Sequence, residues 1–245
     1  MISKTKIQRW VRKSHRYLGL VLGIQFLAWT LGGLYFSWTS IEQIRGEDLH
    51  ADKRPLPIQT KNASLGILLD SLQAANPNMS FKTIQVVDIL GKAYYQIAIS
   101  VDEQVLLFDV KTLRHKQPLT EQQAKNVAQQ SLKSSSEILK VEYLTSTNGH
   151  HEYREKPLPA YAVTFEAPNN TTVYVSTELG TVLSYRNNAW RLFDFLWMLH
   201  TMDYENRDNI NNWLLRLFSV FGLITISSGM LLFYLTTKTK LLQNE

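Results

Sequence analysis

Two apolar runs, one near each end of the chain, limit the possible folds more than any other feature of the sequence. They cover residues 17–38 and 213–234, and each is about 22 residues long, enough for a helix to cross a hydrocarbon core of about 30 Å. Both runs are predicted to be transmembrane helices. The polar stretch between them explains why the mean hydropathy of the whole chain is slightly negative.

The positive charge of the chain lies at its ends. Residues 41–210 hold 17 Lys and Arg against 20 Asp and Glu, although the whole chain carries a formal net charge of +5. A nucleic-acid-binding protein gathers positive charge on its folded domain, so this class is excluded. By the positive-inside tendency, the basic residues that flank the two runs place both termini in the cytoplasm and the middle of the chain outside.

The first apolar run also follows a basic leader, as a cleaved signal sequence would. Its apolar part is too long for a signal, and the residues Phe36 to Thr39 lack a small-residue cleavage pattern. An uncleaved anchor is therefore predicted.

Small and polar residues in the two runs predict that the helices pack on each other. The small residues that would allow close approach include Gly19, Gly23 and Gly229. Gln25 is the one strongly polar side chain of the first run, and in lipid its amide needs a partner. Counting along antiparallel helices places it level with Thr225 and Ser228, so a hydrogen bond to one of these hydroxyls is predicted. Contact with another subunit is the alternative.

The middle of the chain repeats one pattern of elements. A helical stretch at 64–75 precedes strand-like segments at 82–87, 93–101 and 104–110, and a second helical stretch at 120–133 precedes strand-like segments at 139–145, 161–166, 172–176 and 181–185. Thr120 and Gln123 form a candidate capping box for the second helix. The pattern predicts an α+β domain built from a duplicated helix-plus-antiparallel-sheet unit.

Seven segments are therefore predicted. They are a basic cytoplasmic leader at 1–16, a first transmembrane helix at 17–38, a connector at 39–60, an outer domain at 61–188 with repeats at about 61–115 and 118–188, an amphipathic interfacial segment at 189–212, a second transmembrane helix at 213–235 and a cytoplasmic tail at 236–245.

The stretch at 190–204 is amphipathic and rich in aromatic residues. At helical spacing its aromatic stripe includes Trp197 and His200, while Arg191 and Asp194 lie one turn apart on the opposite side. Its place just before an apolar run predicts a position at the membrane interface. The stripe is expected to press on lipid or on a partner, and the two charged residues are expected to turn towards the domain.

Two segments between strands resemble the Asp-x-x-Thr-Gly turn of PepSY domains. The first begins at Asp109 and has Leu113 where glycine is usual, and the second keeps Gly180 but has Ser176 in place of the acid. The resemblance implies that the duplicated unit of the outer domain consists of two PepSY-like repeats.

The flanks at 12–20 and 191–204 resemble the PepSY-associated transmembrane family of bacterial inner-membrane proteins. This resemblance implies a periplasmic domain that serves as a binding or accessory subunit of an inner-membrane complex, or of a homo-oligomer, linked to iron or flavin electron transfer. Larger members resemble haem-containing ferric-siderophore reductases, which gives a haem-binding reductase subunit as the alternative. Soluble PepSY domains give a third interpretation, a protease-inhibitory or regulatory module.

Haem b is the sharpest cofactor hypothesis, with His15 and His200 of the family-like flanks as candidate axial ligands. The predicted topology puts them on opposite membrane faces, roughly 30 Å apart, so one iron within one chain cannot bind both. The alternative interpretation gives each histidine a structural role. His15 would then meet lipid phosphate, and His200 would bond a nearby backbone group or carboxylate such as Asp203.

No catalytic residue and no metal site is predicted. His150, His151 and Glu152 are suitable metal donors, but no second cluster at ligand spacing accompanies them. The absence of cysteine excludes disulfides, iron–sulfur clusters and thiol catalysis. A non-enzymatic role is therefore favoured, with a membrane oxidoreductase subunit as the enzymatic alternative.

Overall fold

The computed structural model describes residues 4–52, 55, 63–100, 104–134 and 137–241. The chain divides into two compact units. One, called the helical unit below, combines residues 1–40 with 192–245. The other, called the sheet unit, comprises residues 41–191.

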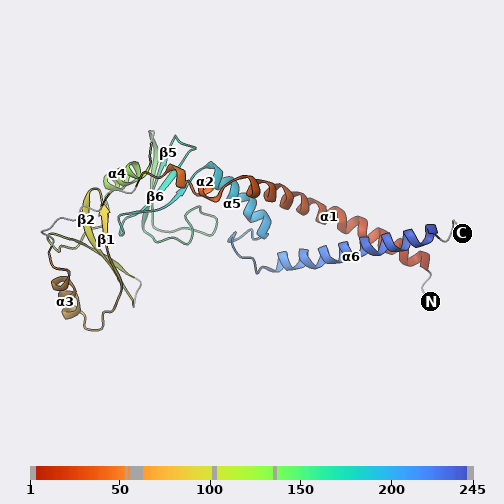
Figure 1. Ribbon diagram of the computed structural model, residues 1–245, viewed down its shortest axis with the longest axis horizontal. Helices are drawn as coiled ribbons and strands as arrows, with labels where there is room; N and C mark the ends of the chain where they lie inside the picture. Colours follow the sequence, from red (N-terminus) through yellow and green to blue (C-terminus); the bar gives the residue numbers. More distant parts are fainter. Residues whose placement is uncertain (1–3, 53–54, 56–62, 101–103, 135–136, 242–245) are drawn as a thin grey trace. The chain divides into compact units, whose positions relative to one another are not determined.

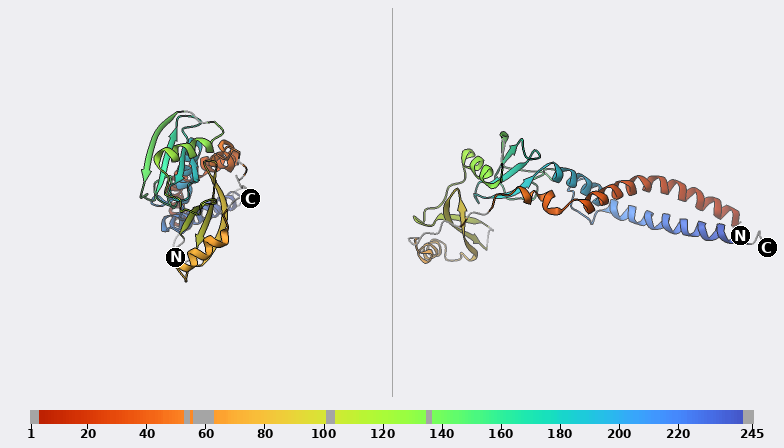
Figure 2. Two further views of the ribbon diagram at one scale, coloured as in Figure 1. Left: turned by 90° about the vertical axis from the view of Figure 1, so that its left-hand side faces the viewer. Right: turned by 45° about the horizontal axis from the view of Figure 1, so that its top comes forward.

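Both apolar runs form long helices of the helical unit. α1 (Lys4–Trp38) and α6 (Trp213–Leu241) contain stretches, Arg9–Trp38 and Trp213–Tyr234, that are long and apolar enough to cross a membrane. The two helices run side by side (Figures 1 and 2). α1 is longer than a bilayer requires, because its 35 residues rise roughly 50 Å.

Different helices cover different parts of α1. The first part of α1 contacts α6, since His15 lies within hydrogen-bond distance of Ser228. The last part contacts α5 (Asn188–Thr201), whose Phe193 ring lies 4.9 Å from that of Phe36. The predicted amphipathic segment is thus a helix that packs on α1.

The sheet unit contains two antiparallel sheets, each preceded by a helix. α3 (Leu65–Ala75) precedes the sheet of β1 (Phe81–Ile89), β2 (Lys92–Ile99) and β3 (Val105–Asp109), in that spatial order. α4 (Glu121–Ser131) precedes the sheet of β4 (Ile138–Leu144), β5 (Ala160–Phe165), β6 (Thr172–Ser176) and β7 (Val182–Arg186), also in spatial order. Every helix and strand predicted between residues 64 and 185 is present to within one or two residues, and the α+β class is confirmed.

Each helix covers the apolar face of its sheet. Leu68 of α3 packs with Ala93 and Ile97 of β2, where inward and outward residues alternate as expected for a sheet covered on one side. Ala124 and Ala128 of α4 have small side chains that allow close approach to β5 and β6. All five residues of β6 are buried, because this strand lies between two others and is covered on both faces.

The predicted capping box at the start of α4 is confirmed. The Thr120 hydroxyl accepts a hydrogen bond from the Gln123 backbone N–H, and the Gln123 side chain accepts one from the Thr120 backbone N–H. These bonds satisfy two backbone donors at the helix start.

The two PepSY-like turns share a backbone conformation. Asp109 accepts hydrogen bonds from the backbone N–H groups of Lys111 and Thr112, both at 2.9 Å. Burial raises the pKa of this carboxyl, but those bonds outweigh burial and leave the pKa below its ordinary value. Leu113 and Gly180 both have positive φ, 53° and 66°. The leucine therefore occupies the left-handed position that favours glycine.

The predicted connector contains two short helices, α2 (Ile41–Arg45) and the 3-10 helix η1 (Glu47–Leu49). Ile44 is only 2% exposed, since α2 packs near β7. Five residues are too few for a clear helical periodicity, which is why the sequence did not reveal α2. Pro57 and most of the remaining connector lie outside the described residues.

Gly180 provides a test of the second turn. A Cβ at this position would lie 2.6 Å from the buried Ile89 Cδ1, whereas a Cβ on Gly91, which also has positive φ, would meet no atom within 4 Å. Gly91→Ala should lower the free energy of unfolding by about 1 kcal/mol through backbone strain alone. Gly180→Ala should lower it by about 2–3 kcal/mol, because overpacking adds to the strain. Denaturation of both variants in detergent measures the difference, and equal losses would contradict the contact.

Candidate functional site

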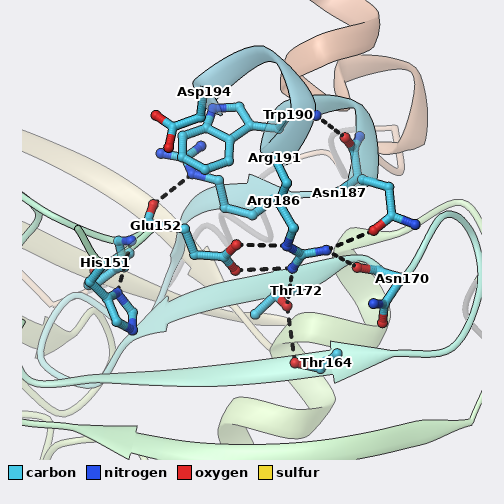
Figure 3. A network of polar contacts seen from close by, with 12 residues as sticks. His151, Glu152, Thr164, Asn170, Thr172, Arg186, Asn187, Trp190, Arg191 and Asp194 are labelled. Carbon is cyan, nitrogen blue, oxygen red and sulfur yellow. Dashed lines mark hydrogen bonds and ion pairs between the residues drawn. The ribbon is translucent and has the colours of Figure 1, made fainter. Parts of the chain in front are cut away.

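A bidentate ion pair fixes the first turn of α5 within the sheet unit. Arg191 Nε donates to Glu152 Oε2 at 2.8 Å, and Arg191 Nη2 donates to Glu152 Oε1 at 3.1 Å (Figure 3). The Arg191 side chain is 32% exposed and the Glu152 side chain is 22% exposed. The parallel alignment of guanidinium and carboxylate makes this pair stronger and more directional than an ordinary surface pair. Arg191 thus turns towards the sheet domain, as predicted.

The ion pair lies at the centre of a wider network of hydrogen bonds. Glu152 Oε1 also accepts a bond of 2.7 Å from the Tyr174 hydroxyl. Arg191 donates further bonds to the Thr172 hydroxyl at 3.0 Å and to the Asn170 carbonyl at 2.8 Å (Figure 3). Both oxygens of the carboxylate are therefore occupied by donors from β6 and α5.

Tyr174 remains a donor at all ordinary pH values. Burial raises the pKa of its hydroxyl, and the charge of Glu152 and the hydrogen bond to it raise that pKa further. The Tyr153 ring stacks on Tyr174 with centroids 4.5 Å apart, and burial raises the pKa of Tyr153 to about 12. Neither phenol can act as a general base near neutral pH.

Arg186 and Trp190 connect the same turn of α5 to β7. The Arg186 guanidinium lies 4.0 Å from the Trp190 ring centroid, and Arg186 Nε donates to the Glu152 backbone carbonyl at 2.8 Å. The Asn187 side-chain oxygen accepts a hydrogen bond of 2.8 Å from the backbone N–H of Trp190. This bond satisfies one of the free backbone donors at the start of α5. The network holds α5 in place, and its charged groups are paired with one another.

The structure uses the His150 to Glu152 stretch for hydrogen bonding. Glu152 pairs with Arg191, and His151 Nδ1 accepts a bond of 3.0 Å from the Tyr153 backbone N–H. Within the described ranges, no group of three or more His, Cys, Asp or Glu side chains is arranged to hold a metal ion. The sequence indicated the direction of Arg191 but not its partner, because Glu152 lies in an irregular loop with no periodic position.

In the helical unit, the predicted polar residues of α6 gather around His15. His15 Nδ1 lies 2.8 Å from Ser228 Oγ and 3.2 Å from the Thr225 carbonyl oxygen. A Cβ at Gly229 would lie 3.1 Å from His15 Cε1, so the glycine makes room for the imidazole. The expected contact of His15 with lipid phosphate is thus replaced by a contact between helices.

The predicted hydrogen bond from Gln25 to Thr225 or Ser228 is wrong. Gln25 Nε2 donates to the Leu199 carbonyl at 2.7 Å, and Trp29 Nε1 donates to the same oxygen at 3.2 Å. Leu199 lies in the last turn of α5, where carbonyl oxygens lack partners within the helix. The prediction counted residues along each helix from a cytoplasmic end placed at residue 17. α1 begins well before that residue, and His15 rather than Gln25 lies level with Ser228.

The predicted close approach at Gly19 and Gly23 does not occur among the described residues. A Cβ at either glycine would meet no atom within 4 Å. α6 contacts a different side of α1, on which Leu22 is buried.

The aromatic stripe of α5 packs on α1, where contact with lipid or a partner was expected. The ring centroid of His200 lies 5.8 Å from that of Trp29 and 6.3 Å from that of Phe36, and Trp197 stacks on His200 with centroids 5.9 Å apart. Trp197 Nε1 also donates to Asp208 at 3.1 Å. The stripe is therefore a packing surface between two helices of one chain.

Asp194 has a cationic partner within the helical unit. Its side chain is 3% exposed and forms an ion pair with Arg207 in the loop before α6. In the same loop Asp203 accepts hydrogen bonds from the backbone N–H groups of Glu205 and Asn209. These backbone groups, and not the imidazole of His200, are the hydrogen-bond partners that the structure gives to Asp203. Burial raises the pKa of Asp203, but the backbone bonds outweigh burial and lower the pKa below its ordinary value.

The two candidate haem ligands lie at different places along α1. His15 contacts α6, whereas His200 lies beside Trp29, which is roughly 20 Å of helix rise farther along α1. Both ring nitrogens of His15 lie 3.8 Å from the position of a Cβ on Gly229, so the half-buried ring packs against α6. One haem ligated by both histidines of a single chain does not fit this arrangement.

Glu152→Gln tests the strength of the ion pair. The amide keeps the size of the carboxylate but loses its charge, so the free energy of unfolding should fall by about 2 kcal/mol. Glu166→Gln is the control, because Glu166 is exposed. Thermal denaturation of both variants in detergent measures the effect, and a loss no larger for Glu152→Gln than for the control would contradict the proposed strength.

Comparison with known proteins agrees with this architecture. The sequence model of the family described as the PepSY-associated TM region matches residues 12–243, essentially the whole chain. No curated protein and no solved structure matches the chain. The protein is thus a membrane protein that belongs to the PepSY-associated TM region family.

Proposed function

We propose that the protein is a non-enzymatic accessory subunit of a bacterial inner-membrane complex. Its two transmembrane helices carry a periplasmic binding domain, and both termini lie in the cytoplasm. The Arg191–Glu152 ion pair carries this proposal, because it fixes the first turn of α5 to the sheet unit, while residues 192–201 of the same helix belong to the helical unit. Through α5, binding to the domain is coupled to the membrane helices.

The state of the charged groups supports binding rather than turnover. Glu152, Asp194 and Asp203 all have cationic or backbone partners, so none is held ready as a general base. The proposal includes two PepSY repeats, supported by the helix before each sheet and by the left-handed turn in each. The family resemblance adds the class of complex, one that handles electrons for iron or flavin.

A haem-binding reductase subunit is the second candidate function. The observation that favours it is the exposed imidazole of His200 among the rings of Trp29, Phe36 and Trp197. His200 would supply one axial ligand and a second copy of the chain the other. Haem bound there would carry electrons, and the rings would exclude water from it.

Single cysteines test the proposed orientation, since the chain has none of its own. Ser146→Cys in the sheet unit and Lys6→Cys at the start of α1 are both exposed positions. A membrane-impermeant maleimide applied to spheroplasts should label Cys at position 146 at once and Cys at position 6 only after lysis. The reverse pattern would place the sheet unit in the cytoplasm and overturn the proposal.

Absorption spectra and native gels separate the two functions. An accessory subunit purified in mild detergent should be colourless, and in gently solubilised membranes it should migrate in a complex larger than its own dimer. A Soret band that is lost in His200→Ala would establish the second candidate in its place. His15→Ala is the matched control, because His15 is half-buried and its Nδ1 already lies at hydrogen-bond distance from Ser228. A colourless protein that migrates alone would contradict both functions.

A further inference from the structure

The sheet unit contains a groove between its two sheets. The groove has a volume of about 570 Å³, which is within the range of about 300–1,000 Å³ typical of ligand sites. One wall consists of the consecutive residues 86–90 of β1 and the turn after it. The opposite wall includes Val127 of α4 and Val182 and Tyr185 of β7, and His50 lies in the groove lining.

The wall formed by β1 is an open sheet edge. β1 is an outer strand of the β1-β2-β3 sheet, and it pairs only with β2 among the strands that the structure describes. An outer strand presents a row of unpaired N–H and C=O groups, to which another extended chain can add. Five consecutive β1 and turn residues face the groove, so its length suits an extended segment rather than a compact ligand.

Two buried polar atoms of the groove have no partner. Asp88 Oδ1 and His50 Nε2 are inaccessible to solvent and lack hydrogen-bond partners among the described residues. A buried polar group without a partner is costly, and most such groups in native proteins are satisfied. The ring centroids of Tyr185 and His50 lie 4.0 Å apart, so the two rings pack on each other in the groove lining.

The charge of the groove is negative. Its described lining includes Asp52 and Asp88 but neither Lys nor Arg. Burial and the charge of Lys133 lower the pKa of His50 and outweigh the charges of Glu47 and Asp48, which raise it, so the neutral form of this imidazole is favoured. A ligand that satisfies Asp88 must donate a hydrogen bond, and a cation does so most strongly.

We infer that this groove binds an extended peptide segment of a partner protein, which adds to the free edge of β1 and places a Lys or Arg side chain against Asp88. The apolar residues of the two walls would contact its neighbouring side chains. The inference rests on the proposed accessory function and deepens it by naming the chemical class of the partner.

Three fluorescein-labelled peptides test this inference on the full chain in detergent. The first has the sequence Thr-Val-Lys-Val-Thr, the second has Glu in place of Lys, and the third is the Lys peptide with alternate backbone nitrogens methylated to block strand pairing. Fluorescence anisotropy should show saturable binding of the Lys peptide, with the Glu and methylated peptides about tenfold weaker or worse.

Asp88→Asn should weaken binding of the Lys peptide about tenfold, since the charge is lost while the size of the side chain is kept. Asp70→Asn is the charge-matched control, because Asp70 is an exposed residue of α3 and should leave binding unchanged. Melting curves of both variants establish that the fold is intact.

Equal binding of the Lys and Glu peptides, or of the Lys peptide to wild type and Asp88→Asn, would overturn the role of Asp88. Equal binding of the methylated peptide would overturn pairing with the free edge of β1. Absence of all binding would overturn the inference, but it would leave the colourless spectrum and the larger native complex unaffected, so failure here is distinguishable from failure of the proposed function.

Discussion

The ion pair between Arg191 and Glu152 ties the first turn of α5 to the loop before β5. Removing two charges from water costs more than their attraction returns unless the geometry is good and the remaining donors and acceptors are satisfied. Here the pair is bidentate, and Tyr174 and Thr172 supply the additional bonds. Arg191 therefore has one favourable position, and this position holds the first turn of α5 against β6.

The helical unit obeys the same requirement in a more demanding solvent. Lipid offers no hydrogen bonds, so each polar side chain of a membrane helix needs a partner within the protein, and long side chains reach a neighbouring helix. His15 finds Ser228 in α6, and Gln25 finds the free carbonyl of Leu199 near the end of α5. These two contacts fix α1 at separate points, one against each neighbouring helix.

Sequence patterns predicted the fold well because they report local physics. The alternation of β2 and the capping box at Thr120 depend on neighbours in the chain, and both could be read directly. The partners of Gln25 and Asp194 depend on how helices distant in sequence are aligned, and a shift of one turn, about 5.4 Å, replaces every partner. Arg207 lies in an irregular loop, where no periodicity indicates that it pairs with Asp194.

Asp88 differs from the other shielded carboxylates of the chain. Glu152, Asp194 and Asp203 each receive charged or backbone donors, which shows that this fold can satisfy such groups. Asp88 Oδ1 has no donor among the described residues, and it lies on an outer strand whose free edge faces a groove. A fold that merely protected this edge would gain from a lysine or proline there. An unpaired acid beside an open edge instead costs stability, and a basic segment bound in the groove would recover it by satisfying the carboxylate and the backbone together.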